Sequence, residues 1–250
     1  KALAFSALVL SPMAFANISA YAPLQQSPVL ERHIDALMIQ AKMPVAKKPI
    51  AVNRVRQAYD RVCEQQSTAA CQSVKQYLSR FDASVSFNSA NLKLKSTTPA
   101  EQSLANQRGE DADSPYVARA HFFWQVASYF AVNGGFQADS SDVTPEDTYI
   151  SVGSDWAQLD IGYKPHWLSP FRHSAMLLST HAATMPSFSV SNPLPFDFLG
   201  FSYELFVAEM SKSEVIRYEG GYTVGKPLLA GMHFEISPIE GFSLSANRIM

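Results

Sequence analysis

Cysteine is scarce in this chain of 250 residues, which contains only Cys63 and Cys71. No histidine lies between or beside the two cysteines, so they lack the further ligands that a structural zinc site needs. In an exported protein, two cysteines this close in sequence predict a local disulfide. The alternative is a pair of free thiols, and neither interpretation gives the cysteines a catalytic role.

An excess of charge of either sign is absent as well. Lys and Arg number 20 against 22 Asp and Glu, which gives a formal net charge of −2 at pH 7. The one basic cluster, Lys47-Lys48, is too short for a binding patch, so no nucleic-acid partner is expected. His166, His173 and His181 are not spaced as in a helical metal site, and neither a metal nor a cofactor is predicted.

Long apolar runs are missing apart from the first residues of the chain. Lys1 is followed by the apolar run 2–10, by Ser11-Pro12 and by the small-x-small triplet 14–16. This pattern predicts a signal peptide over residues 1–16, with cleavage after Ala16 and with the start of its n-region clipped, so the sequence is expected to be a fragment. The alternative is an ordinary buried helix, and the run is too short to span a membrane.

Motifs of hydrolytic catalysis are also lacking. The chain has no G-x-S-x-G elbow, and a Ser-His-Asp set assembled from Asp160, His166, His173, Ser169 and Ser174 has no meaningful spacing. Acidic pairs lie in polar segments, where they keep a loop solvated, and Gly134-Gly135 is interpreted as a turn. No catalytic residue is predicted, and the protein is not expected to be an enzyme.

Helical periodicity is confined to the residues that follow the signal. Apolar side chains recur at helical spacing in three segments, 29–41, 52–62 and 70–81, and the cysteine pair lies between the second and third of them. Three short helices form a small module over residues 17–82 that needs a neighbouring domain to pack on.

From residue 83 onward the apolar period changes to two. The alternation is longest over 116–133, where only the odd positions carry charged or amide side chains, and this segment is interpreted as one strand. Soluble strands are usually about five or six residues long, whereas a strand that crosses a membrane in a barrel needs about nine to eleven. The length favours a transmembrane barrel, and a soluble two-sheet sandwich is the alternative.

Shorter alternating segments recur at 83–95, 157–163, 201–207, 228–236 and 242–247. The first is expected to kink at Ser89-Ala90, so that Val85 and Phe87 face one way and Leu92 and Leu94 the other. Short connections alternate with long polar ones, such as 134–147, as a barrel with two different rims requires. Aromatic residues near strand ends are candidates for interfacial girdles: Tyr149, Trp156, Trp167, Phe196 and Phe198.

The segment 156–186 contains a strand, an aromatic-Pro corner, a second apolar strand and a Met-Pro exit. With the later segment 232–248, it resembles the Wzi-type capsule assembly family of outer-membrane proteins. The resemblance covers most of residues 28–250, and it departs from the family's pattern at Leu168, Ser169 and His181. The matching motifs are Gly162-Tyr163, Trp167-Leu168-Ser169-Pro170, the strand 174–179, the exit 181–186, and the strand–Pro turn–strand of Met232–Pro238 and Phe242–Arg248.

The resemblance implies an all-β transmembrane antiparallel barrel, incomplete in this chain, with a small N-terminal α-helical module in the periplasm. Residues 83–250 would form the N-terminal part of the barrel in the outer membrane of a Gram-negative bacterium. The implied function is lectin-like: attachment of capsular polysaccharide or exopolysaccharide to the cell surface. The alternatives are a porin-like channel for small solutes and, less favoured, an outer-membrane hydrolase.

Polysaccharide contacts are predicted at the aromatic-Pro corner. Glycans are bound by aromatic faces that cover sugar rings and by planar polar groups that satisfy hydroxyls. The corner supplies both kinds of group in one short segment: Tyr163, His166, Trp167, Arg172 and His173. The alternative roles are an interfacial anchor for Trp167 and an ion pair with a lumen acid for Arg172.

Overall fold

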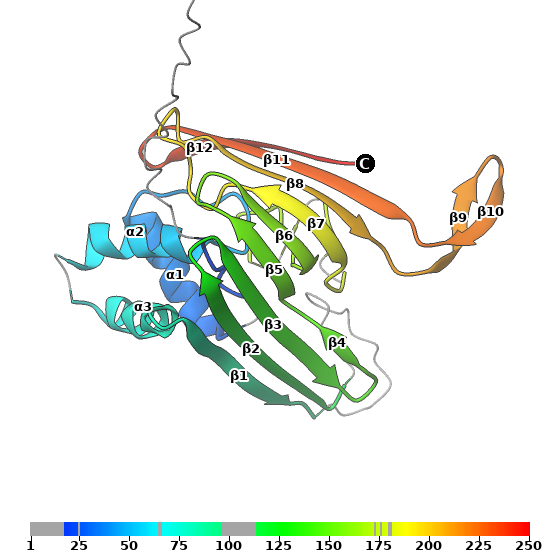
Figure 1. Cartoon of the computed structure of the whole chain (residues 1–250), viewed down its shortest axis with the longest axis horizontal. Helices are drawn as coiled ribbons and strands as arrows, with labels where there is room; N and C mark the ends of the chain where they lie inside the picture. The colour runs from blue at the N-terminus through cyan, green and yellow to red at the C-terminus, as the bar shows by residue number, and fades with distance from the viewer. Residues whose placement is uncertain are drawn as a thin grey trace, which may run out of the picture.

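The structure is a computed structural model that describes residues 18–24, 26–64, 67–96, 114–172, 174–175, 177–179 and 182–250. Three helices come first and are followed by a broad antiparallel sheet, with the helices gathered at one end of it (Figure 1). Within the described residues, no helix has both the length and the apolar character needed to cross a membrane. The predicted signal peptide, 1–16, lies outside the described residues.

The helices are α1 (Pro28–Gln40), α2 (Val52–Cys63) and α3 (Ala69–Leu78), and α3 continues into the short 3-10 helix η1 (Ser79–Phe81). Pro28 occupies the first turn of α1, where its missing N–H is not needed. The apolar faces of the three helices share one core, which also includes Phe123 and Ala131 of the sheet. The helices therefore do not form a core by themselves, as expected for so small a module.

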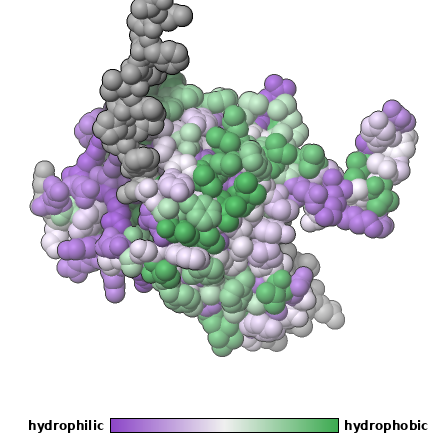
Figure 2. Space-filling model, viewed as in Figure 1, coloured by the Kyte–Doolittle hydropathy of each residue, from purple (hydrophilic) through white to green (hydrophobic). Residues whose placement is uncertain are grey.

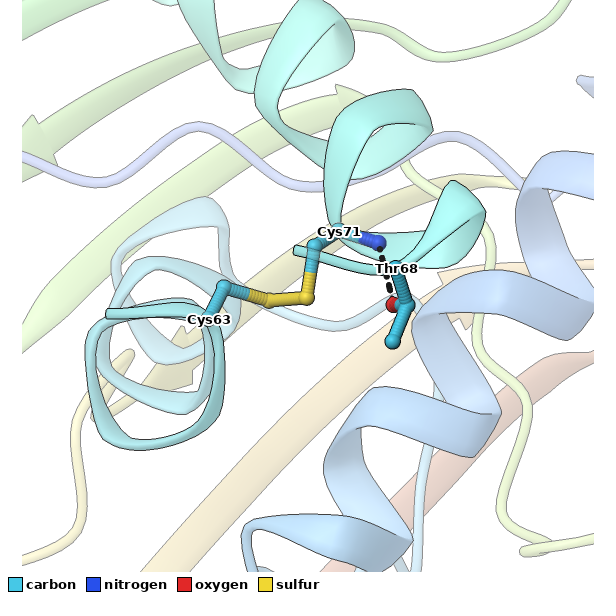
Figure 3. Close-up of a disulfide and its surroundings, with 3 residues drawn as sticks. All are labelled: Cys63, Thr68 and Cys71. Carbon is cyan, nitrogen blue, oxygen red and sulfur yellow. Dashed lines mark hydrogen bonds between the residues drawn. A yellow bond between two sulfur atoms is a disulfide. The ribbon is translucent and has the colours of Figure 1, made fainter. Parts of the chain in front are cut away.

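A disulfide joins Cys63 and Cys71, with the two Cα atoms 5.6 Å apart, and links the end of α2 to the first turn of α3 (Figure 3). Thr68 caps α3, because its side-chain oxygen accepts a hydrogen bond of 3.2 Å from the Cys71 amide. The cap and the disulfide both fix the start of α3.

Removing the disulfide is expected to destabilise the helical module by about 2–3 kcal/mol, because the unfolded chain then regains the entropy of a short closed loop. The variant is Cys63→Ala with Cys71→Ala, and the measurement is the free energy of unfolding followed by the helical signal in circular dichroism. An equal unfolding midpoint in oxidised and reduced protein would contradict the expectation.

The strands form one antiparallel sheet in the order β1-β2-β3-β5-β6-β7-β8-β11-β12, with β4 paired to β3. Two further strands, β9 and β10, form a separate hairpin that projects beyond the sheet (Figure 1). The strand bounds are β1 Val85–Leu94, β2 Tyr116–Ala127, β3 Phe130–Asp139, β4 Val143–Pro145, β5 Thr148–Gly153, β6 Gln158–Tyr163, β7 Pro186–Ser191, β8 Ser202–Glu209, β9 Ser213–Tyr218, β10 Gly221–Gly225, β11 Leu228–Ile239 and β12 Phe242–Ile249. The predicted antiparallel sheet with N-terminal helices is confirmed, and the sheet is open between β1 and β12.

The two faces of the sheet differ in polarity. One row of paired residues crosses eight strands and is apolar at every position: Val85, Trp124, Val132, Ile150, Ile161, Phe188, Val207 and Ala230. Another row, on the face that contacts the helices, is polar at every position: Gln158, Ser191, Glu204, His233 and Asn247. We call the first face the outer face and the second the inner face.

Burial reverses the usual order of a soluble protein. Ile161 and Phe188 of the outer face are 43% and 49% exposed, whereas Gln158 and Glu204 of the inner face are 0% and 2% exposed. In Figure 2 hydrophobic side chains cover much of the surface over the strands, and hydrophilic ones gather over the helices. A water-soluble protein rarely exposes so extended an apolar surface.

The interpretation of 116–133 as a single strand is wrong. The chain turns at residues 128–129 between β2 and β3, so that the segment is a hairpin. The two-residue turn by itself would reverse the phase of the alternation, but the register also shifts between Gln125 and Ala127. This bulge restores the phase, which is why the alternation does not reveal the turn. Gly134-Gly135 is likewise not a turn but lies inside β3, where a Cβ on Gly134 would clash with the Phe122 ring.

The expected kink in the first strand is present, but its consequence differs from the prediction. The register of β1 against β2 shifts between Phe87 and Ser89, which marks a bulge. Because the bulge inserts one residue, Leu92 and Leu94 return to the face of Val85 and Phe87, and all four are exposed.

Connections differ in length at the two ends of the sheet. The end that contacts the helices, here the helical end, carries the turns 128–129, 154–157 and 240–241, with the longer link 192–201. The opposite loop end carries the connections 140–147, 164–185 and 210–227, the last of which includes the β9–β10 hairpin. The expected alternation of tight turns and long loops is therefore present, although 134–139 belongs to β3.

The second strand expected after the aromatic-Pro corner is absent from the described residues of 174–179, and the next strand, β7, begins at Pro186. The girdle prediction is wrong for Tyr149 and Trp167, which are buried on the inner side of the sheet. Trp156 and Phe198 are exposed near the helical end, where rings of Phe196, Phe201 and Tyr203 stack.

Candidate functional site

A buried ion pair on the inner side of the sheet joins Asp160 of β6 to Lys164, which follows the strand. Lys164 Nζ lies 2.5 Å from Asp160 Oδ2, and Asp160 Oδ1 accepts hydrogen bonds from Ser151 and Gln158. The Tyr21 ring covers the lysine, with its centroid 4.1 Å from Nζ. Burial by itself would lower the pKa of Lys164, but the charge of Asp160 raises it above its usual range, so the lysine stays charged.

A second buried pair lies beside it on β8. Lys47 Nζ contacts Glu204 Oε2 at 2.5 Å, and Glu204 Oε1 lies 2.7 Å from His166 Nδ1. The other ring nitrogen of His166 lies 2.9 Å from Ser187 Oγ, so Ser187, His166 and Glu204 follow the bonding order of a serine hydrolase triad. Burial lowers the pKa of His166 despite its bond to Glu204.

The space beside these three side chains is small. The cavity beside His166 has a volume of about 50 Å³, which holds a few water molecules but no sugar ring. Glu204 is also bound by Lys47, so its charge joins the helical module to the sheet. We conclude that the cluster positions the module.

The aromatic-Pro corner also holds the helical module. Trp167 and Lys48 exchange two backbone hydrogen bonds of 2.8 and 3.0 Å, and the Trp167 indole donates to the Phe171 carbonyl. Arg172 binds Asp35 of α1 at 2.8 Å and the Pro28 carbonyl at 2.9 Å. The corner therefore folds back from the loop end and packs on α1.

The structure separates the residues that were predicted to contact polysaccharide. His166 and Trp167 are engaged in buried contacts, and Arg172 is committed to α1. His173 lies outside the described residues. Of the four predicted residues that the structure describes, only Tyr163, at the rim on the face of Ile161, lines a cavity large enough for a glycan, and sequence spacing gave no sign of this division.

This cavity lies at the loop end and has a volume of about 610 Å³. Its walls come from β3 and β4, from the ends of β6 and β7, from the segment 182–186 and from the start of the β9–β10 connection. Glu209 and Lys226 form an ion pair of 2.6 Å within it. The sequence analysis missed this pair and Thr184, because the lining is assembled from distant segments and no local motif marks it.

Glu146 lies at the base of the cavity in a buried polar group. Its Oε2 lies 3.2 Å from Arg119 Nε, and the same guanidinium donates to Gln137. The carboxylate of the next residue, Asp147, lies with its Oδ2 3.4 Å from His121 Nε2. Burial, together with the neighbouring Asp147, raises the pKa of Glu146 to about 7. Among the described residues, no three His, Cys, Asp or Glu side chains are grouped so as to hold a metal ion.

Glu146 is expected to make the protein less stable as pH rises from 5 to 8. Between the ordinary pKa of the unfolded chain and about 7, the folded state binds more protons, so the free energy of unfolding falls with pH. Glu146→Gln should remove more than about 1 kcal/mol of this pH dependence. Urea unfolding at both pH values tests this, with the exposed Glu64→Gln as the control; an unchanged pH dependence in Glu146→Gln would refute it.

Comparison with known proteins agrees with this architecture. The family model for the capsule assembly protein Wzi matches residues 53–250. A search of curated proteins finds no match. A solved structure of Wzi, an outer membrane protein involved in group 1 capsule assembly in Escherichia coli and described as a carbohydrate-binding β-barrel, matches with a TM-score of 0.62 and 14% identity.

The structural match covers 93% of this chain and 53% of that protein, so the chain spans about half the length of the solved barrel. At this identity the match establishes a shared fold: an antiparallel β-sheet resembling the Wzi barrel, with N-terminal helices. The family model extends over most of the chain, from within α2 to Met250. The chain therefore belongs to the Wzi capsule assembly protein family.

Proposed function

We propose that this protein is an outer-membrane barrel that binds carbohydrate and takes part in capsule assembly. The observation that carries the proposal is the apolar row on the outer face of the sheet, opposite a buried polar face. Acyl chains solvate an apolar outer face, whereas exposure of the same face to water would carry a large free-energy cost. The family membership adds the link to capsule assembly.

The orientation follows from the connections. Barrels of the outer membrane have short turns on the periplasmic side and longer loops outside the cell. The helical end has the tight turns, so the helical module, residues 17–82, lies in the periplasm, and residues 83–250 form the barrel wall. Residues 1–16 act as the export signal of a Gram-negative outer-membrane protein.

The occupied inner face favours attachment of polysaccharide at the cell surface over conduction of solutes. The helical module reaches the inner face through the buried pair Lys47–Glu204, and the partly exposed pair Arg172–Asp35 holds the corner on α1. A channel needs a water-filled path along this face. We therefore propose a lectin-like anchor for capsular polysaccharide or exopolysaccharide, with no catalytic activity.

The test is deletion of the gene in its own encapsulated host. The expected result is capsule that is released from the cells into the medium, with retention restored by the intact gene. Unchanged capsule retention in the deletion strain would contradict the anchor. Steady single-channel conductance of the purified protein in planar bilayers, without polysaccharide binding, would favour the channel.

A further inference from the structure

At the loop end, the strands in the middle of the barrel wall end earlier than the two hairpins that flank them. Strands β5, β6 and β7 have six residues each, and their last paired row is Thr148, Tyr163 and Pro186. On one side β3 continues into its pairing with β4, and on the other the β9–β10 hairpin projects (Figure 1). We call this gap the rim notch, and the 610 Å³ cavity fills it.

The rim notch is closed below by a floor of protein atoms. The segment 182–186 crosses it, with Thr184 and Met185 lining both this cavity and the small one beneath. Gln137 and Glu146 are buried at its base and are held by the Arg119 guanidinium. A rigid base with polar groups is the usual form of a ligand site.

The lining of the rim notch has the composition of a sugar site. Tyr163 supplies an aromatic ring at the edge of the wall, and hydroxyls come from Thr144, Thr184, Ser211 and Ser213. The charged side chains are two acids and two bases, Glu146, Glu209, Lys212 and Lys226. These charges balance once Glu146 is ionised, above its pKa of about 7, and the lining then has no net attraction for an anionic chain.

We propose that the rim notch is the glycan-binding site, in which neutral sugar units of a polysaccharide stack on Tyr163 and are held through their hydroxyls by Glu209, Lys226 and Thr184. This rests on the proposed carbohydrate-binding function. The notch opens the wall at its rim, so that a long polymer can lie across it without threading an end into the barrel. Polar contacts without net charge also predict that binding changes little with ionic strength.

The test is binding of the purified full-length protein in detergent to immobilised bacterial surface polysaccharides, both neutral and acidic. Tyr163→Ala should weaken binding at least tenfold, and Tyr163→Phe, which keeps the ring, less than about threefold. Tyr129→Ala, an exposed tyrosine at the helical end, is the matched control and should bind as the wild type does. Heat-modifiable migration in gels verifies that each variant is folded.

The outcomes separate this site from the function on which it rests. Binding of neutral polysaccharide that is lost in Tyr163→Ala and insensitive to salt between 50 and 500 mM, values chosen as roughly three-fold either side of physiological, supports the site. Equal binding by Tyr163→Ala and the wild type overturns the site while leaving carbohydrate binding intact. Binding restricted to acidic polysaccharides and abolished by salt overturns the neutral class, and no binding to any polysaccharide overturns both the site and the proposed function.

Discussion

Lys164→Met is expected to lower the free energy of unfolding by about 3–5 kcal/mol, because it leaves the buried carboxylate of Asp160 without its charged partner. Ser151 and Gln158 still donate hydrogen bonds to that carboxylate, but neither neutralises its charge. The Tyr21 ring also loses the cation that it covers. Urea unfolding of the protein in detergent micelles measures the difference.

The second change that tests this explanation is Asp160→Asn in the Lys164→Met background. Removing both charges should recover most of the lost stability, since an unpaired buried charge costs far more than the absence of the pair. Lys75→Met, an exposed lysine on α3, is the matched control and should unfold as the wild type does. A loss below about 1 kcal/mol in Lys164→Met would show that the pair is hydrated and contradict the buried network.

Ile161→Arg is expected to destabilise the folded protein in a bilayer by about 2–4 kcal/mol. Ile161 lies within the apolar row of the outer face, between Ile150 and Phe188, and an arginine there must lie among acyl chains. In a water-soluble sheet the same change at a position 43% exposed would have little effect. The measurement is the free energy of folding into lipid vesicles from urea titration.

The matched control is Ile39→Arg on α1. Ile39 is also an exposed isoleucine, at 77%, but it belongs to the helical module, which we assign to the aqueous periplasm. This variant should fold as well as the wild type. Equal effects of the two arginines would contradict a lipid-facing outer face.

The faces of most strands are predictable from the sequence because alternation is a local property of extended backbone. Ile161 and Asp160 of β6, or Leu205 and Glu204 of β8, fall on the faces that the pattern predicts. Turns and bulges are harder. The two-residue turn between β2 and β3 would reverse the phase, but the bulge before it in β2 restores the phase. The bulge in β1 reverses it, and none of these events has a distinctive local signal.

Which partner each residue of the aromatic-Pro corner binds is not predictable from the sequence. The indole of Trp167 and the guanidinium of Arg172 could bind a sugar or the helical module equally well. The choice depends on Asp35 and Lys48, which lie more than a hundred residues earlier in the chain and approach the corner only in the folded state. Tyr163 is the predicted residue that the fold leaves beside a large cavity.

The Glu209–Lys226 pair of the rim notch is likewise not predictable from the sequence. The two residues flank the β9–β10 hairpin, and the pairing of β8 with β11, in which Glu209 lies opposite Leu228, brings them together. Thr184 joins them from the segment before β7. A site built from loop-end residues of several strands has no continuous motif, so the family resemblance indicates the fold without indicating this cavity.

The most direct test of the central claim, that the apolar face of the sheet lies in lipid, is quenching of tryptophan fluorescence by brominated acyl chains. Trp124 lies on the outer face and is 47% exposed, whereas Trp167 is buried against the helical module. The protein is reconstituted in vesicles of brominated phosphatidylcholine, and the wild type is compared with Trp124→Phe and Trp167→Phe. We predict that the emission lost in Trp124→Phe is strongly quenched and that the emission lost in Trp167→Phe is not; unquenched Trp124 emission would contradict the membrane barrel.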